Sequence, residues 1–184
     1  TAMLTVAVLA ACSTDSSYRP GSSTVQSEAG NPNAQVASPL PADAVADAVF
    51  EVLSNPHRHQ ALDGSGFVRG VDHADRIHEV GQVFTMNMEG EHMGGEYQVD
   101  NHVTGYADDK LVAWQTAPAG TEPKGWEWMY ELEAHGPKET AVTLTYDWSK
   151  VTDKELLKKV HFPLVEKHAL EESLAKLEER ATSN

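Results

Sequence analysis

Apolar and polar residues alternate along much of the chain between residue 83 and residue 148. In the stretch 83–88, apolar side chains occupy every second position, at Phe84, Met86 and Met88. The same period of two gives one face to each later run: Tyr97, Val99, Asn101 and Val103; Trp114; Trp126, Trp128, Tyr130 and Leu132; Val142, Leu144, Tyr146 and Trp148. This alternation predicts strands with one buried face. The short connections at 107–110 and 135–139 predict antiparallel neighbours, because parallel crossovers need longer connections.

A helix is predicted before these strands. Val45, Val49 and Val52 recur with helical spacing, Pro41 stands near the expected start, and Asn55-Pro56 marks the end. Two short segments follow: HRHQAL, read as a further short turn of helix, and DGSG, read as a loop.

A long amphipathic helix is predicted at the other end of the chain. Thr152 and Glu155 have the spacing of a capping box, and Pro163 suits the first turn of another helix. An apolar stripe then runs along one side, formed by Val165, Leu170, Leu174, Leu177 and Ala181. We expect this stripe to cover the aromatic face of the sheet, which is the only large apolar surface available.

The chain opens with an apolar run that ends at its single cysteine, Cys12. The run 3–11 is far shorter than the roughly 20 residues of a membrane span, but it fits the apolar region of a secretory signal. Leu9-Ala10-Ala11-Cys12 resembles a bacterial lipobox, which predicts a truncated lipoprotein signal over 1–12 and lipidation of Cys12. The alternative is a short buried helix.

The segment after Cys12 has the composition of a linker. Residues 13–40 are rich in Ser, Pro, Gly, Asn and Gln, so they bury too little surface to order on their own. The division predicted is therefore signal 1–12, disordered linker 13–40 and one domain 41–184. It predicts an extracytoplasmic protein anchored to a bacterial membrane; the alternative location is the cytoplasm.

The composition limits the classes of partner. The formal net charge is −14, which repels nucleic-acid phosphates and leaves no basic stripe to bind them. One cysteine cannot form an internal disulfide. We expect no nucleic-acid partner.

Two parts of the sequence carry a resemblance to a known family. DAVFEVLSNPHRHQALDGSG and WEWMYELEAHGPKETAVTLTYDWSKV resemble the SRPBCC superfamily, which is START-like, in its polyketide cyclase/dehydrase-like branch. The resemblance implies an α+β helix-grip fold: a curved antiparallel sheet wrapped around a long C-terminal helix, with an apolar cavity between them. That family opens with a strand before its first helix. Here Pro39 and Pro41 restrict any such strand to about 34–38.

The aromatic and methionine face of the sheet provides the candidate ligand-binding residues. They are Phe84, Met86, Met88, Tyr97, Trp114, Trp128, Tyr130, Tyr146 and Trp148. An apolar pocket with a few polar groups is the usual small-molecule site, and the hydroxyls of Tyr97 and Tyr130 would supply polar groups. The alternative is that these side chains simply fill the core.

The sequence gives less support for catalytic residues than for ligand-binding residues. Arg58, His59, Asp63 and Asp147 stand near the expected ends of elements, and His59 is the best candidate for a general base because histidine titrates near neutrality. A histidine that stabilises a loop is the alternative. No zinc-binding spacing, nucleophile elbow, phosphate loop or dinucleotide fingerprint is present, so we expect neither a metal nor a cofactor.

Three functions compete on this evidence. The leading one is binding of a hydrophobic small molecule, lipid-like or polyketide-like, by a membrane-tethered protein. The second is a cyclase, aromatase or dehydrase that uses polar cavity residues, and it rests on the family resemblance alone. The third is a structural envelope lipoprotein without a ligand.

Overall fold

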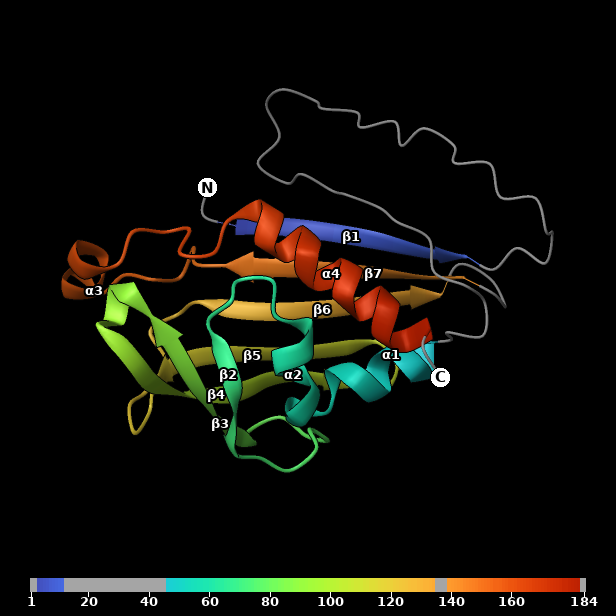
Figure 1. Ribbon diagram of the computed structural model, residues 1–184, viewed down its shortest axis with the longest axis horizontal. Helices are drawn as coiled ribbons and strands as arrows, with labels where there is room; N and C mark the ends of the chain where they lie inside the picture. Colours follow the sequence, from blue (N-terminus) through green and yellow to red (C-terminus); the bar gives the residue numbers. More distant parts are fainter. Residues whose placement is uncertain (1–2, 12–45, 135–138, 183–184) are drawn as a thin grey trace, which may run out of the picture.

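The sheet of this protein has seven strands in the computed structural model, which describes residues 3–11, 46–134 and 139–182. The strands are β1 (Met3–Ala11), β2 (Val68–His73), β3 (Val83–Gly90), β4 (Gly95–Ala107), β5 (Leu111–Pro118), β6 (Glu127–Ala134) and β7 (Glu139–Asp147). Their order in space is β1-β7-β6-β5-β4-β3-β2, and every pairing is antiparallel (Figure 1). The antiparallel arrangement predicted for 83–148 is confirmed.

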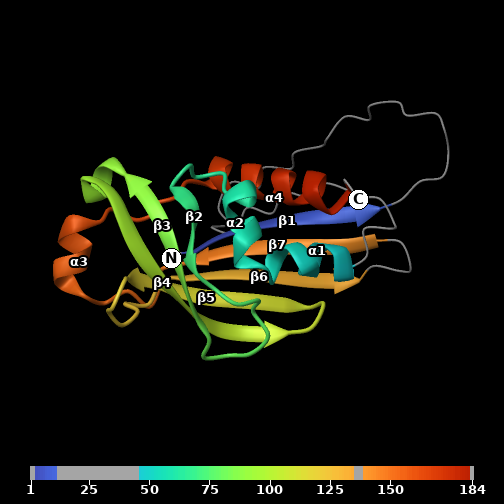
Figure 2. The same cartoon turned by 60° about the horizontal axis from the view of Figure 1, so that its bottom comes forward.

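The helices are α1 (Ala46–Leu53), α2 (Pro56–Leu62), α3 (Lys154–Lys159) and α4 (Lys167–Thr182), with a 3-10 turn, η1, at Glu91–Met93. Both ribbon views show α1, α2 and α4 on the same side of the sheet, with α3 at one end (Figures 1 and 2). The result is an α+β helix-grip fold, as predicted.

Local sequence explains where the N-terminal helices stop and start. Asn55 is the N-cap of α2: its side chain accepts a hydrogen bond from the amide of His57 at 3.2 Å. Pro56 then occupies the first turn, where its missing amide proton costs nothing. The pair that was predicted to end α1 therefore also begins α2.

Irregularities in two strands accompany the curvature of the sheet. The β4–β5 pairing shifts between Val103 and Gly105, and β2 shifts register twice against β3. Such bulges bend a strand and increase its twist. Gly105 suits its bulge because a Cβ there would stand 3.1 Å from the Cβ of Ala113 and 3.2 Å from Leu111 Cδ2.

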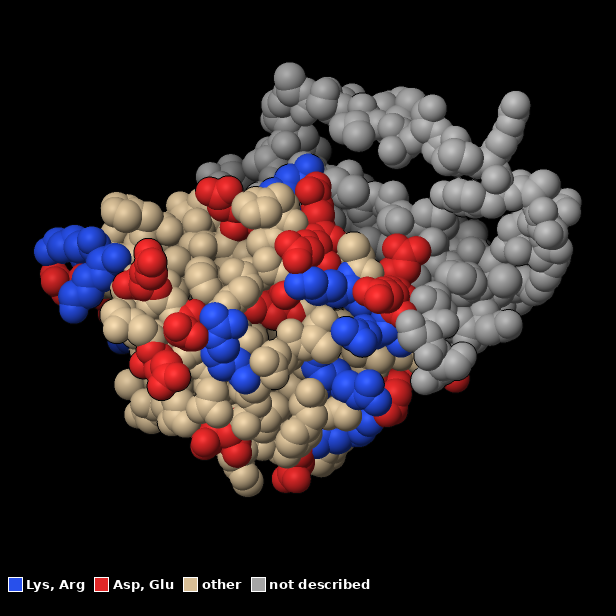
Figure 3. All heavy atoms as spheres, viewed as in Figure 1, with Lys and Arg blue, Asp and Glu red and all other residues tan. Residues whose placement is uncertain are grey.

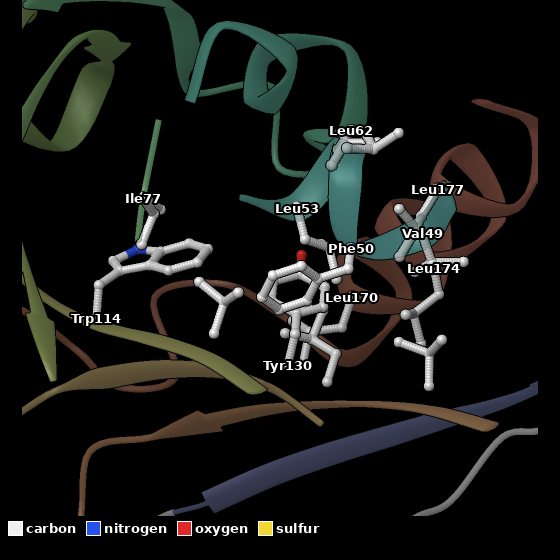
Figure 4. Packing of buried hydrophobic residues seen from close by; sticks show 14 of the residues in the cluster. Val49, Phe50, Leu53, Leu62, Ile77, Trp114, Tyr130, Leu170, Leu174 and Leu177 are labelled. Carbon is white, nitrogen blue, oxygen red and sulfur yellow. The ribbon is translucent and has the colours of Figure 1, made fainter. Parts of the chain in front are cut away.

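The core lies between the concave face of the sheet and the helices. Tyr130 of β6 reaches toward the helices, where it lies by Leu53 and Leu170, and Trp114 of β5 lies beside Ile77 (Figure 4). All five residues of the predicted C-terminal stripe are buried, with exposed fractions of 7% or less. The prediction that α4 covers the aromatic face is confirmed.

Three local predictions were wrong or incomplete. The N-cap of α3 is Asp153, one residue after the predicted Thr152, and its carboxylate accepts hydrogen bonds from the amides of Glu155 and Leu156. Pro163 opens no helix, because α4 begins only at Lys167. Strand β2 was not predicted at all.

The apolar run at the N-terminus forms strand β1, which pairs antiparallel with β7 from Met3 opposite Asp147 to Ala11 opposite Glu139. The helical alternative for this run was therefore wrong. Cys12, the predicted linker 13–40 and the short strand considered at 34–38 lie outside the described residues.

Candidate ligand-binding site

A cavity of about 210 Å³ lies between the concave face of the sheet and the helices. Strands β3 to β7 supply one wall, and α1, α2, α3, α4 and the connection 160–165 supply the other. Three exposed residues belong to the lining, His92, Met93 and Pro118, so the cavity meets the surface near η1 and the end of β5. The site is an apolar cavity that opens to the surface in this region.

The sheet forms its wall through the alternation of side chains, because every second side chain of a strand points to the same face. Eight of the nine predicted binding residues line the cavity: Phe84, Met86, Met88, Tyr97, Trp114, Trp128, Tyr130 and Tyr146. Trp148 does not, because β7 ends at Asp147 and the alternation ends with it. Its ring instead stacks on Phe162, with 6.1 Å between centroids and 12° between planes. Contact of any of these residues with a ligand stays a prediction.

The aromatic side chains also pack against one another. Trp128 stacks on Tyr146 at 4.2 Å, and Trp114 stacks on Tyr130 at 5.9 Å. These contacts hold the rings of the wall in fixed orientations, since neighbouring rings restrict each other's rotation. The same residues therefore fill part of the core and shape the space that remains.

Polar groups in the wall are few and mostly paired. Asn101, 4% exposed in β4, accepts a hydrogen bond through Oδ1 from Thr116 Oγ1 of β5 at 2.7 Å. The Tyr97 hydroxyl lies 3.3 Å from His92 Nε2 near the mouth. Burial raises the pKa of Tyr97, Tyr130 and Tyr146, so all three hydroxyls stay protonated at neutral pH. These hydroxyls and the amide of Asn101 can orient a polar group on an apolar ligand.

His59 lines the cavity but is poorly suited to act as a general base. Its Nε2–H donates to the backbone carbonyl of Leu53 at 2.8 Å, and its ring stacks on Trp114 at 5.1 Å. Burial lowers the pKa of His59 to about 4, which outweighs the opposite effect of that hydrogen bond. The ring is therefore neutral at pH 7 and only weakly basic. The contacts support the alternative predicted for it, a histidine that stabilises local structure.

The DGSG loop forms one side of the cavity and is fixed by its own aspartate. Asp63 Oδ1 accepts hydrogen bonds from the amide and the hydroxyl of Ser65 at 2.9 and 2.6 Å, and Oδ2 accepts one from the Val68 amide at 2.9 Å. The loop also meets α4 directly, because the amide of Gly64 donates to Ser173 Oγ at 2.9 Å. Asp63 lines the cavity.

The other predicted catalytic candidates lie elsewhere. Arg58 is exposed on α2, and Asp147 ends β7, where it accepts a hydrogen bond from the Ser149 amide. Neither lines the cavity. Within residues 3–11, 46–134 and 139–182, no group of three His, Cys, Asp or Glu side chains is placed to hold a metal ion.

Several wall residues were not predicted as binding residues. The connection before α4 contributes Val160, Phe162 and Leu164, and β5 contributes Thr116. Asn101 was placed on the correct face but not proposed as a site residue. A polar residue at an inward position of an otherwise apolar strand is the signal that would have identified it.

The described part of the chain has no helix that is both long enough and apolar enough to cross a membrane.

Comparison with known proteins places the fold. No family model matches the sequence. The chain is 34% identical over 105 residues to the uncharacterized protein Rv0088 of Mycobacterium tuberculosis, a match that covers 57% of this chain and 43% of that protein. The chain thus spans less than half the length of this curated relative.

Two solved structures share the architecture. A protein from Arthrobacter aurescens matches with a TM-score of 0.53 at 12% identity, over 78% of this chain and 83% of that chain. The AHSA1-like protein from Aeromonas hydrophila matches with a TM-score of 0.50 at 15% identity, over 76% of this chain and 85% of that chain. At these identities the likeness concerns the fold alone, which is of the helix-grip type.

Proposed function

We propose that this protein binds a hydrophobic small molecule, lipid-like or polyketide-like, in the cavity between its sheet and α4. The observation that carries the proposal is an apolar chamber of about 210 Å³ with a mouth near Met93 and a few oriented polar groups. Folds of this type commonly bind hydrophobic ligands. Transfer of apolar surface from water into such a chamber drives binding at about 25 cal/mol per Å².

The polar groups give the chamber an orientation. Asn101 and Thr116 lie in the wall made by β4 and β5, and the Tyr97 hydroxyl lies nearer the mouth. A ligand that carries one polar group on an apolar body would satisfy one of these positions and bury the remainder against aromatic rings and methionines.

Blocking the chamber tests the proposal. Met88 is half-buried on the inward face of β3, so Met88→Trp should fill the space and abolish binding of a neutral fluorescent probe such as N-phenyl-1-naphthylamine. Met129→Trp is the matched control, because Met129 lies on β6 between Trp128 and Tyr130 and so faces the opposite side. Thermal melts of both variants establish that they remain folded.

Native mass spectrometry of protein purified without detergent supplies a second readout. The wild type and Met129→Trp should retain a small molecule or take up the probe, and Met88→Trp should do neither. Equal probe binding in folded wild type and Met88→Trp would exclude the cavity as the site.

We further propose that the protein is tethered to a bacterial membrane through a lipid on Cys12. The support is the sequence pattern: an apolar run of the length of a signal's core, small residues before the cysteine, and a polar segment after it. Processing of this kind would remove residues 3–11, which form β1. The tether therefore implies a mature sheet whose edge is β7.

A further inference from the structure

Among the described residues, the lining of the cavity holds one carboxylate and no lysine or arginine. That carboxylate belongs to Asp63. The remaining polar lining residues are two serines, Asn101, Thr116, the tyrosines, the tryptophans and two histidines, His59 and His92. No group in the lining therefore offers a permanent positive charge to a ligand.

The carboxylate of Asp63 is held in place rather than neutralised. Two amides and one hydroxyl donate hydrogen bonds to it, an arrangement that is complementary to an ionised carboxylate. Its charge reaches the cavity, because after burial it is the next cause that raises the pKa of Tyr97 and of Tyr130. The nearby ammonium of Lys176 is bonded to the backbone carbonyl of Asp63 at 2.7 Å and to Glu172 at 2.8 Å, and it does not line the chamber.

His59 adds an acceptor to the same wall. Its only ring proton is on Nε2 and is donated to Leu53, so Nδ1 carries a lone pair. With its pKa near 4, the ring does not become a cation at neutral pH. The carboxylate at this side of the chamber favours a ligand that donates hydrogen bonds, and His59 adds no positive charge that would favour an anion.

A ligand carboxylate or phosphate would face the Asp63 carboxylate and find no positive charge in the lining. It would lose its hydration without gaining a positive partner, and burying such a charge unpaired is costly. We propose that the chamber selects neutral or cationic apolar molecules with a hydrogen-bond donor, such as long-chain alcohols or amines, and rejects anionic ones such as ionised fatty acids. This inference rests on the proposed ligand-binding function and narrows its ligand class.

Three competitors with ten carbons each test the selectivity. Decanol, decylamine and decanoic acid are titrated at pH 7.5 against N-phenyl-1-naphthylamine bound to the wild-type protein, each below its aggregation limit. We expect the alcohol and the amine to displace the probe at concentrations at least tenfold lower than decanoate. Decanoate that competes as well as decanol would overturn the inference while leaving the binding function intact. Failure of the probe and all three competitors to bind would overturn the binding function itself.

A variant at the mouth distinguishes the effect of the cavity lining on ligand preference from the effect of the protein's net charge. Met93 lines the chamber yet is 46% exposed, so Met93→Lys adds a cation there with little effect on packing. Val80→Lys is the charge-matched control, because Val80 is 58% exposed and outside the lining. Met93→Lys should reduce the preference for decanol over decanoate several-fold, and Val80→Lys should leave it unchanged. An equal change in both variants would trace the preference to the net charge of −14 and overturn the inference.

Discussion

His59 keeps an ionisable ring inside the wall of the cavity, and its burial makes the stability of the protein depend on pH. The pKa of the ring is about 4 in the folded protein, against an ordinary value of 6.5. Above pH 6.5 the ring is neutral in both the folded and the unfolded chain. Between pH 6.5 and 4 the unfolded chain binds a proton that the folded protein does not. The free energy of unfolding should therefore decrease as the pH is lowered from 6.5 to 4, by about 3 kcal/mol in all.

Chemical denaturation between pH 7 and 4.5 measures this loss. His59→Gln removes the titrating ring and keeps a donor for the Leu53 carbonyl, so its stability should vary much less with pH. His57→Gln changes an exposed histidine on the same helix and should keep the wild-type dependence. An unchanged pH dependence in His59→Gln would mean that other groups cause it.

At the residue scale, the alternation of apolar and polar residues along each strand predicted which side chains line the cavity. It identified eight wall residues, since side chains alternate between the two faces along the stretches of β3 to β7 that line the cavity. It did not reveal that Asn101 and Thr116 form a pair across β4 and β5, because register between strands depends on the bulge after Val103. Nor did it reveal that His59 would be buried, because HRHQAL is mostly polar.

At the element scale, the DGSG loop packs directly against α4. A Cβ added at Gly64 would stand 2.1 Å from the carbonyl oxygen of Ala169 and 2.9 Å from the amide nitrogen of Ser173. Both are backbone atoms of a helix, so the loop would have to move and would lose its hydrogen bond to Ser173 Oγ. We expect Gly64→Ala to lower the free energy of unfolding by about 3 kcal/mol or more.

Gly66→Ala in the same loop is the control for backbone strain. Gly66 has a φ of +75°, and no atom lies within 4 Å of the position that an added methyl group would take, so alanine there meets strain but no collision. Its expected cost is about 1–2 kcal/mol. Urea denaturation of both variants compares them, and a Gly64→Ala protein as stable as Gly66→Ala would show that the loop does not need this close contact.

Strand β2, which the sequence did not predict, has irregular pairing. In β2, Val68 and Val71 both pack against the core although they are three residues apart, because the register shifts between Val68 and Gly70. That spacing hides the period of two by which strands are recognised. Strands β3 to β7 keep the period over most of their length and were predicted.

At the scale of the whole molecule, α4 and the sheet could be matched from the sequence because each has one apolar face. The cavity between them could not, since its volume depends on how Phe162, Leu164 and the other residues of the connection before α4 fill the remaining space. Composition likewise gave the sign of the net charge, but the surface in Figure 3 shows acidic and basic side chains interspersed over the face that carries α4.

The segment 3–11 has two possible fates, as the edge strand β1 or as a signal that is removed, and one protein molecule cannot have both. If Cys12 becomes the lipidated N-terminus, the mature domain lacks β1 and β7 becomes an edge. We expect the protein made in a bacterial host to enter the membrane fraction, with an N-terminal peptide that starts at Cys12 and carries the added mass of a lipid. Cys12→Ala should move the protein to the soluble fraction, whereas Ser13→Ala, next to it, should not. Recovery of soluble wild-type protein that retains residues 3–11 would exclude the tether and assign these residues to the folded sheet.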